Sequence, residues 1–213
     1  MDVLTSDSLT SFLLDFNNVT FSRGRNTLFS GLHFSVQPGQ AIWLQGKNGQ
    51  GKTSVLKLAM RLMQPDAGVI RWGSAFDDGG APTYIGHLNG QSVDLTVLES
   101  LTFSARMHSV RVSVEAAAMA LKRTSLYAHR NRLVHSLSQG ERRRLALTRL
   151  LLNKSALWVL DEPLDALDTA STVLVMRLIE EQVDTGGAVL MSSHIPFHMP
   201  NLQVLSLTSP TAS

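Results

Sequence analysis

The chain has 213 residues, of which 44% are hydrophobic and 17% charged, with a net charge of +2 and no cysteine. This length and apolar content predict one sizeable core and leave too little chain for two full domains. The absence of cysteine excludes a disulfide framework. The small net charge by itself neither favours nor excludes a nucleic-acid partner.

The N-terminal segment, residues 1–7, carries acidic residues ahead of its apolar stretch, and it lacks the basic region and the cleavage site of a secretory signal. No run of the sequence approaches the roughly 18 apolar residues that a membrane span requires. We therefore expect a cytosolic chain that acts at a membrane only by docking to another protein.

The first part of the chain reads as strands with a glycine-rich loop and a helix between them. Residues 12–21 and 28–36 predict two antiparallel strands, because a turn-forming cluster separates them. Further short strands are predicted at residues 40–45, 69–72 and 83–87. The apolar face of a helix predicted at residues 54–63 consists of Val55, Leu58, Ala59 and Leu62.

Between residues 95 and 152 the apolar periodicity becomes helical. Thr96 begins one helix, with Glu99 at the spacing of a capping box, and residues 112–126 predict a second, alanine-rich helix. Lys and Arg greatly outnumber acidic residues in this part of the chain. They form either a solvated helical face or a surface that docks a partner or binds anions.

The C-terminal part alternates strands with a helix. The strands are predicted at residues 155–160, 188–192 and 203–207, and the helix at residues 173–182. Such alternation indicates a parallel α/β sheet. We therefore expect a single domain, 1–213, in which residues 1–92 and 153–213 form the α/β core and residues 93–152 form a helical subdomain.

The strand at residues 40–45 leads into the pattern G-x-x-x-x-G-K-T at residues 46–53. Between a strand and a helix this pattern is typical of a phosphate-binding loop, in which backbone N–H groups and the helix dipole attract phosphate oxygens. Lys52 would place an ammonium on the terminal phosphates, and the Thr53 hydroxyl would ligate Mg²⁺. The predicted phosphate-binding residues are Gly46, Asn48, Gly49, Gly51, Lys52, Thr53 and Ser54.

Two carboxylates, Asp161 and Glu162, follow the apolar strand predicted at residues 155–160. Open α/β sheets bind their ligands at the carboxyl ends of parallel strands. Asp161 is suited to hold Mg²⁺, and Glu162 to orient and deprotonate a water that attacks a γ-phosphate. Two adjacent acids are a weak signal alone and a strong one beside the loop at residues 46–53.

Residues 137–141 read Leu-Ser-Gln-Gly-Glu and precede a helix that carries three consecutive arginines. This segment resembles the LSGGQ signature of ATP-binding cassette (ABC) ATPases, with glutamate in place of the final glutamine. The resemblance implies that Ser138, Gly140 and Glu141 bind the γ-phosphate of a nucleotide held by a second copy of the chain. Ser138 and Glu141 also have the spacing of an ordinary capping box, and the two roles are compatible.

Two more segments resemble the same family. Residues 164–168 resemble its D-loop, with Asp165 where serine is usual, and residues 191–194 resemble the segment that ends in its switch histidine. The resemblance implies that His194 hydrogen-bonds the γ-phosphate and positions the attacking water.

The sequence departs from the family at two positions. Leu88 stands where the Q-loop glutamine is expected, so either Asn89 or Gln91 substitutes after a shift of register, or coupling and hydrolysis are altered. The aromatic residue that stacks on adenine aligns with Arg23, whose guanidinium can also stack. Phe21 is the alternative.

The resemblance extends from residue 12 to residue 207 and implies an α/β fold: a P-loop NTPase core of the RecA-like type with an antiparallel β layer and an inserted α-helical subdomain. It implies an ATPase that uses Mg²⁺ and works as a homodimer with two sandwiched nucleotides. The interval between Thr53 and Ser138 leaves no room for the coiled-coil arm of DNA-repair relatives, so no nucleic-acid partner is expected.

Softer motifs at residues 27–32, 84–87, 95–101 and 156–163 resemble the ATPase subunits of cytochrome c maturation complexes. In such complexes, ATP hydrolysis would act through integral membrane ABC permease subunits at the cytoplasmic face of the inner membrane. The purpose would be haem export or release of a haem-loaded chaperone. The alternatives are the ATPase subunit of another ABC importer or exporter, and a non-transport module that uses ATP as a structural clamp.

Overall fold

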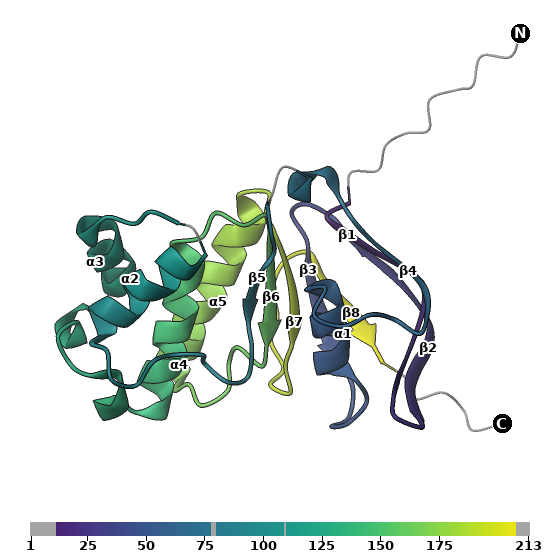
Figure 1. The fold of residues 1–213 in the computed structure, drawn as a ribbon, viewed down its shortest axis with the longest axis horizontal. Coiled ribbons are helices and arrows are strands. Elements are labelled where there is room, and N and C mark those ends of the chain that lie inside the picture. The colour runs from purple at the N-terminus through teal and green to yellow at the C-terminus, as the bar shows by residue number, and fades with distance from the viewer. Residues whose placement is uncertain (1–11, 78–79, 109, 208–213) are drawn as a thin grey trace, which may run out of the picture.

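The computed structural model describes residues 12–77, 80–108 and 110–207, so the N-terminal segment 1–7 lies outside the described residues. Figure 1 shows an antiparallel sheet, a parallel sheet, and a layer of helices on the far side of the parallel sheet. The antiparallel sheet has the order β2-β1-β4, and its strands are β1 (Leu14–Arg23), β2 (Asn26–Val36) and β4 (Ala67–Trp72).

The parallel sheet has the strand order β5-β6-β7-β3-β8. Its strands are β3 (Ala41–Gln45), β5 (Thr83–Ile85), β6 (Leu157–Asp161), β7 (Ala188–Ser192) and β8 (Leu202–Ser206). The helices are α1 (Lys52–Ala59), α2 (Val97–Met107), α3 (Val114–Arg123), α4 (Gln139–Thr148) and α5 (Thr169–Asp184). Short 3₁₀ turns cover Ser74–Phe76, Tyr127–His129, Val134–Ser136 and Arg149–Leu151.

The strands β6, β7 and β3 of the parallel sheet are buried on both faces, which explains why they are continuous apolar runs. Successive side chains point to opposite faces. Ile42 and Leu44 join the core between the two sheets, where α1 packs. Ala41 and Trp43 join a second core, which α4 and α5 cover. Because β3 is fixed from both sides, the loop that follows it starts from a rigid support.

Helices α2, α3 and α4 lie between β5 and β6 in the chain and enclose a third apolar cluster. Thr96 with Glu99, and Ser138 with Glu141, form the two predicted capping boxes. The elements match the expected α/β core with an antiparallel layer and inserted helices. The subdomain limits at residues 93 and 152 remain a prediction.

Three helix boundaries differ from prediction. Helix α1 ends at Ala59, Arg61 has a φ of 56°, and Leu62 is 61% exposed, so residues 60–63 do not extend the predicted helix. Helix α3 is shorter than residues 112–126. Helix α5 begins before residue 173, because the Asp168 side chain accepts a hydrogen bond from the Ser171 N–H and caps it.

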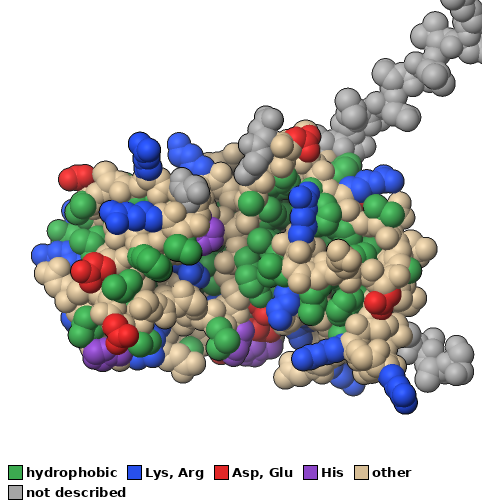
Figure 2. Space-filling model, in the orientation of Figure 1, with side chains coloured by type: hydrophobic (Ala, Val, Ile, Leu, Met, Phe, Trp, Pro, Cys, Tyr) green, Lys and Arg blue, Asp and Glu red, His purple; other side chains and the backbone are tan. Residues whose placement is uncertain are grey.

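Most of the basic residues of the helical part are exposed or half-buried. Figure 2 shows Lys and Arg side chains spread over both halves of the visible surface. Arg143 is an exception, because it is only 3% exposed, and the choice between a solvated face and a docking or anion-binding surface stays a prediction. None of the described helices is long and apolar enough to span a bilayer.

Candidate functional site

The loop after β3 and the start of α1 form one wall of an open pocket of about 410 Å³. Gly51, with a φ of 96°, is the N-cap of α1, and no side chain caps the helix there. The first-turn N–H groups therefore face the pocket without an internal side-chain acceptor. The pocket is lined by Arg23, Leu28, Asn48, Gly49, Gly51, Lys52, Thr53, Ser54, His87, Asp161 and Glu162.

Lys52 is held within this loop. Its side chain is 8% exposed, and Nζ donates hydrogen bonds to the backbone oxygens of Gly46 at 2.7 Å and Lys47 at 3.4 Å. These bonds close the loop on itself and keep the ammonium at the wall of the pocket. Gly46 contributes its carbonyl here and does not itself line the pocket.

The opposite wall is the end of β6. Asp161 is 3% exposed, and its two carboxylate oxygens are both engaged. Thr53 Oγ1 donates to Asp161 Oδ2 at 3.0 Å, and Ser192 Oγ donates to Oδ1 at 2.7 Å. Ser192 lies at the end of β7 and was not predicted as a site residue. Its hydroxyl also accepts from the Glu162 N–H at 3.0 Å, so it positions both acids.

Glu162 has a φ of 49°, a left-handed conformation that is strained for a residue with a Cβ. Its Oε2 accepts hydrogen bonds from the His194 backbone N–H at 3.0 Å and from Nδ1 at 2.9 Å. Because an ionised carboxylate only accepts, the second bond requires a proton on Nδ1. Glu162 and His194, both predicted as site residues, are thus brought into contact.

Arg143 on α4 connects the helical part to this edge of the sheet. Its guanidinium donates to the carbonyl oxygens of Gly86 at 2.7 Å, Asp161 at 2.6 Å and Glu162 at 2.8 Å. It also donates to Asn89 Oδ1 at 3.1 Å. Burial lowers the pKa of Arg143, and the nearby Asp161 partly opposes that effect.

Arg23, and not Phe21, lines the pocket. Phe21 is 8% exposed and stacks on Phe29 with 6.0 Å between ring centroids, so its ring belongs to the core. Arg23 ends β1 beside a turn in which Gly24 has a φ of 63°. The alternative assignment of Phe21 as the adenine-stacking residue is therefore wrong for this geometry.

The loop after β5 differs from the sequence-based expectation. Leu88 is 86% exposed and is absent from the lining of the pocket, whereas its neighbour His87 lines it. Neither amide proposed as a substitute is directed there. Asn89 accepts from Arg143, and Gln91 Nε2 donates to the Arg142 carbonyl at 2.8 Å.

The signature residues are not part of this pocket. Ser138, Gly140 and Glu141 line a separate open pocket at the start of α4, together with Ala166 and Asp168. A Cβ on Gly140 would lie 2.8 Å from the Ala166 carbonyl oxygen, so only glycine allows this approach. Burial raises the pKa of Glu141, but hydrogen bonds from Ser138 and the nearby His129 and Arg132 together lower it.

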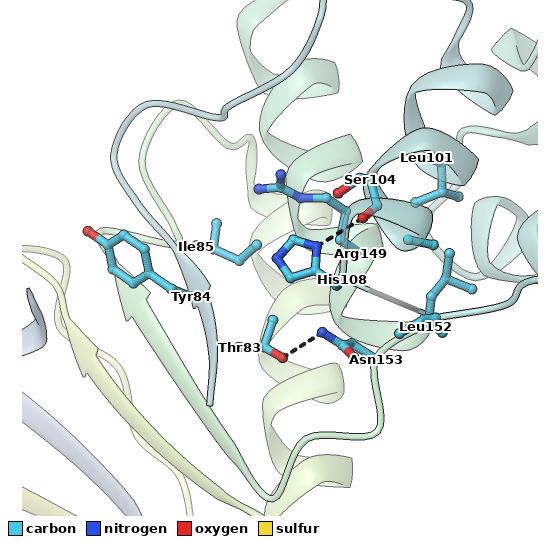
Figure 3. A pocket seen from close by; sticks show the side chains of 11 residues that line it. Thr83, Tyr84, Ile85, Leu101, Ser104, His108, Arg149, Leu152 and Asn153 are labelled. Carbon is cyan, nitrogen blue, oxygen red and sulfur yellow. Dashed lines mark hydrogen bonds between the residues drawn. The ribbon is translucent and has the colours of Figure 1, made fainter. Parts of the chain in front are cut away.

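A further, small pocket of about 20 Å³, with room for about one water molecule, lies between β5 and the helices (Figure 3). Leu101, Ala105 and Leu152 supply apolar walls, and Arg149 reaches into it. Within the described part of the chain, Arg149 makes no ion pair, and its Nε donates to the Ala146 carbonyl at 3.1 Å. Burial lowers the pKa of Arg149, and repulsion from Arg143 lowers it further.

Comparison with known proteins agrees with this arrangement of motifs. Residues 29–165 match the family described as ABC transporter. The chain belongs to the ABC transporter family. The cytochrome c biogenesis ATP-binding export protein CcmA of Nitrosomonas europaea is 39% identical to this ABC protein over 198 residues, 90% of this chain and 93% of the relative. CcmA of Nitrosospira multiformis is 41% identical over 83% of this chain and 89% of its own length.

Solved ABC structures share the fold. An ATP-binding protein of the ABC type from Pyrococcus furiosus has a TM-score of 0.80 at 23% identity, covering 91% of this chain and 96% of that one. An ATP-binding cassette solved as a dimer with ADP and phosphate has a TM-score of 0.74 at 20% identity, covering 85% and 88%. These likenesses confirm the predicted ABC ATPase fold.

The donor set of this ABC ATP-binding subunit suits a magnesium nucleotide. The Thr53 hydroxyl and the Asp161 carboxylate are hard oxygen donors of the type that Mg²⁺ prefers. A Cβ on Gly49 would meet nothing within 4 Å, and the φ of 87° there is one that glycine adopts readily. The loop thus keeps its backbone open for close approach by phosphate oxygens.

We predict that Arg143→Met lowers the free energy of unfolding by about 3 kcal/mol or more, because several buried carbonyls lose their donor at about 1–3 kcal/mol each. Urea titration followed by tryptophan fluorescence measures the change. The matched control, Arg111→Met, removes an exposed arginine that makes no hydrogen bond or ion pair among the described residues and should change stability by under about 0.5 kcal/mol. Equal stability of the two variants would contradict the structural role of Arg143.

Proposed function

We propose that this chain is the ATP-hydrolysing subunit of a membrane ABC translocase for cytochrome c biogenesis. Its work would drive haem export or release of a haem-loaded chaperone at the cytoplasmic face of the inner membrane. The observation that carries this proposal is similarity over nearly the whole chain to relatives named as cytochrome c biogenesis ATP-binding export proteins. That of Xanthomonas axonopodis is 36% identical over 94% of this chain and 95% of its own length.

In this proposal the pocket beside α1 holds ATP. Lys52 and the N–H groups from Asn48 to Ser54 bind the phosphates, and Arg23 stacks on adenine. Thr53 and Asp161 hold Mg²⁺, which would neutralise charge on the phosphates. The hydrogen bond between Thr53 and Asp161, at 3.0 Å, supports this assignment because it brings the two oxygen donors together at the loop.

Glu162 is the proposed general base. It accepts a proton from the water whose oxygen attacks the γ-phosphorus, while the bond from that phosphorus to the bridging oxygen breaks and ADP leaves. His194 is the proposed switch histidine. The 2.9 Å contact between His194 Nδ1 and Glu162 Oε2 supports this role, because it orients the carboxylate that would activate the water.

Each site is proposed to be completed by a second copy of the chain, whose Ser138, Gly140 and Glu141 would meet the γ-phosphate. Two observations support a homodimer. The signature residues line a pocket of their own, apart from the loop. A solved ATP-binding cassette with this fold is dimeric with ADP and phosphate bound.

The integral membrane permease subunits of the cytochrome c maturation system are the proposed partners. We further propose that an acidic side chain of such a subunit docks at the mouth of the pocket shown in Figure 3 and pairs with Arg149. Charge complementarity supports this partner chemistry. A half-buried guanidinium with no carboxylate beside it among the described residues is costly, and an incoming carboxylate would offset that cost.

We predict that Lys52→Ala and Glu162→Gln each lower the ATPase kcat of the assembled complex by about 100-fold or more, and Ser138→Ala by about 10-fold or more. Glu162→Gln should still bind ATP, because it removes the base and leaves the phosphate contacts. Ser113→Ala is the control for Ser138→Ala, since Ser113 caps α3 in the same way. Full activity in all three site variants would overturn the assignment.

Deletion of the gene should abolish c-type cytochromes, detected by haem staining of membrane proteins. A wild-type copy should restore them, and a Lys52→Ala copy should not. Normal cytochromes in the deletion strain would favour another ABC importer or exporter. Full restoration by Glu162→Gln would favour a structural ATP clamp, because that variant binds ATP without the proposed base.

We predict that Arg149→Gln reduces the membrane subunit recovered with this chain by about 5-fold or more, because the buried carboxylate of the partner loses its counter-charge. ATP binding by the isolated chain should stay unchanged. Arg177→Gln, on the exposed side of α5, is the matched control. Equal recovery with both variants would exclude the proposed ion pair.

A further inference from the structure

His87 is the residue of the β5–α2 loop that faces the proposed nucleotide pocket. It lines that pocket together with Lys52, Thr53, Asp161 and Glu162. His87 also lines a neighbouring depression that contains Asp165 and Ala166, and Leu88 lines only that depression. The backbone path after β5 therefore directs the imidazole, and not the leucine, toward the phosphate-binding groups.

The loop that carries His87 is fixed by α4. The Gly86 carbonyl and the Asn89 side chain accept hydrogen bonds from Arg143, and the Gln91 side chain donates to the Arg142 carbonyl. These contacts hold the residues on both sides of His87 and engage the Oδ1 of Asn89 and the Nε2 of Gln91. His87 is exposed and, among the described residues, makes no hydrogen bond or ion pair of its own. Its ring nitrogens are thus available to a ligand.

We infer that the His87 imidazole donates a hydrogen bond to a γ-phosphate oxygen of bound ATP. This inference rests on the proposed function of the pocket. The chemistry favours a donor at this place, because Asp161 and Glu162 lie on the same wall and both accept. A phosphate oxygen between these acids and the β5–α2 loop needs a hydrogen-bond donor from that loop. His87 is the residue of that loop that lines the pocket.

The same contact would connect the nucleotide to the signature helix. His87 follows Gly86, whose carbonyl is bound by Arg143, and Arg143 lies in the first two turns of α4. Helix α4 begins beside Ser138, its N-cap. A displacement of His87 toward a γ-phosphate would therefore move the loop that Arg142 and Arg143 connect to α4 by hydrogen bonds.

The test compares nucleotides that differ only at the γ-position. Binding of a non-hydrolysable ATP analogue and of ADP, each with Mg²⁺, is measured by calorimetry on the full chain. His87→Ala should weaken binding of the analogue by roughly 10-fold, as expected for loss of a charge-assisted hydrogen bond, and change ADP binding by less than about 2-fold. His87→Gln, whose amide can still donate, should recover most of the lost affinity.

Two controls separate this role from a structural one. His33→Ala removes an exposed imidazole on β2, and Leu88→Ala truncates the neighbouring side chain of the same loop; both should bind each nucleotide like the wild type. Equal weakening of analogue and ADP by His87→Ala, or no weakening of either, would overturn the inference while leaving the ATP site intact. Failure of the wild-type chain to bind either nucleotide would overturn the proposed function as well.

Discussion

The buried guanidinium of Arg143 is the contact on which the geometry of the pocket depends. A cation at 3% exposure is tolerated only when its N–H groups find acceptors, and here the main acceptors are carbonyls at the ends of β5 and β6. Those two strands pair in the parallel sheet, whereas Arg143 belongs to the helical layer. The planar fork of arginine can bind several carbonyls at once, which the single ammonium of a lysine cannot do in the same geometry.

The hydrogen bonds from Arg143 help to explain why the two adjacent carboxylates, Asp161 and Glu162, have different partners. Glu162 adopts a left-handed conformation, which costs about 1–2 kcal/mol for a residue with a side chain. Its carbonyl is held by Arg143 and its N–H by Ser192, so the surroundings maintain that conformation. As a result Asp161 bonds to Thr53 and Ser192, while Glu162 bonds to His194. One acid is placed toward the loop and the other toward the switch segment.

Local patterns in the sequence were sufficient for much of this arrangement. The glycine-rich loop, the apolar strands and the two capping boxes depend on residues within a few positions of each other, and the structure contains them. The end of α1 was mispredicted because Leu62 continues the apolar spacing, and only the φ of 56° at Arg61 reveals the break. Ser192 was missed because its role arises from the pairing of β6 with β7, which brings residues 161 and 192 together.

The loop after β5 shows most clearly that local sequence patterns do not predict contacts between distant parts of the chain. Motif alignment assigned the important position to Leu88, since the order of residues in an irregular loop does not say which side chain points inward. That direction is set by bonds to Arg142 and Arg143, which lie more than 50 positions away along the chain. Because the same two arginines lie in the first two turns of the helix that carries the signature, the direction of His87 and the position of that helix relative to the loop depend on the same hydrogen bonds. A substitution in α4 that weakens the hydrogen bonds between these arginines and the loop would therefore alter the nucleotide pocket without contacting it.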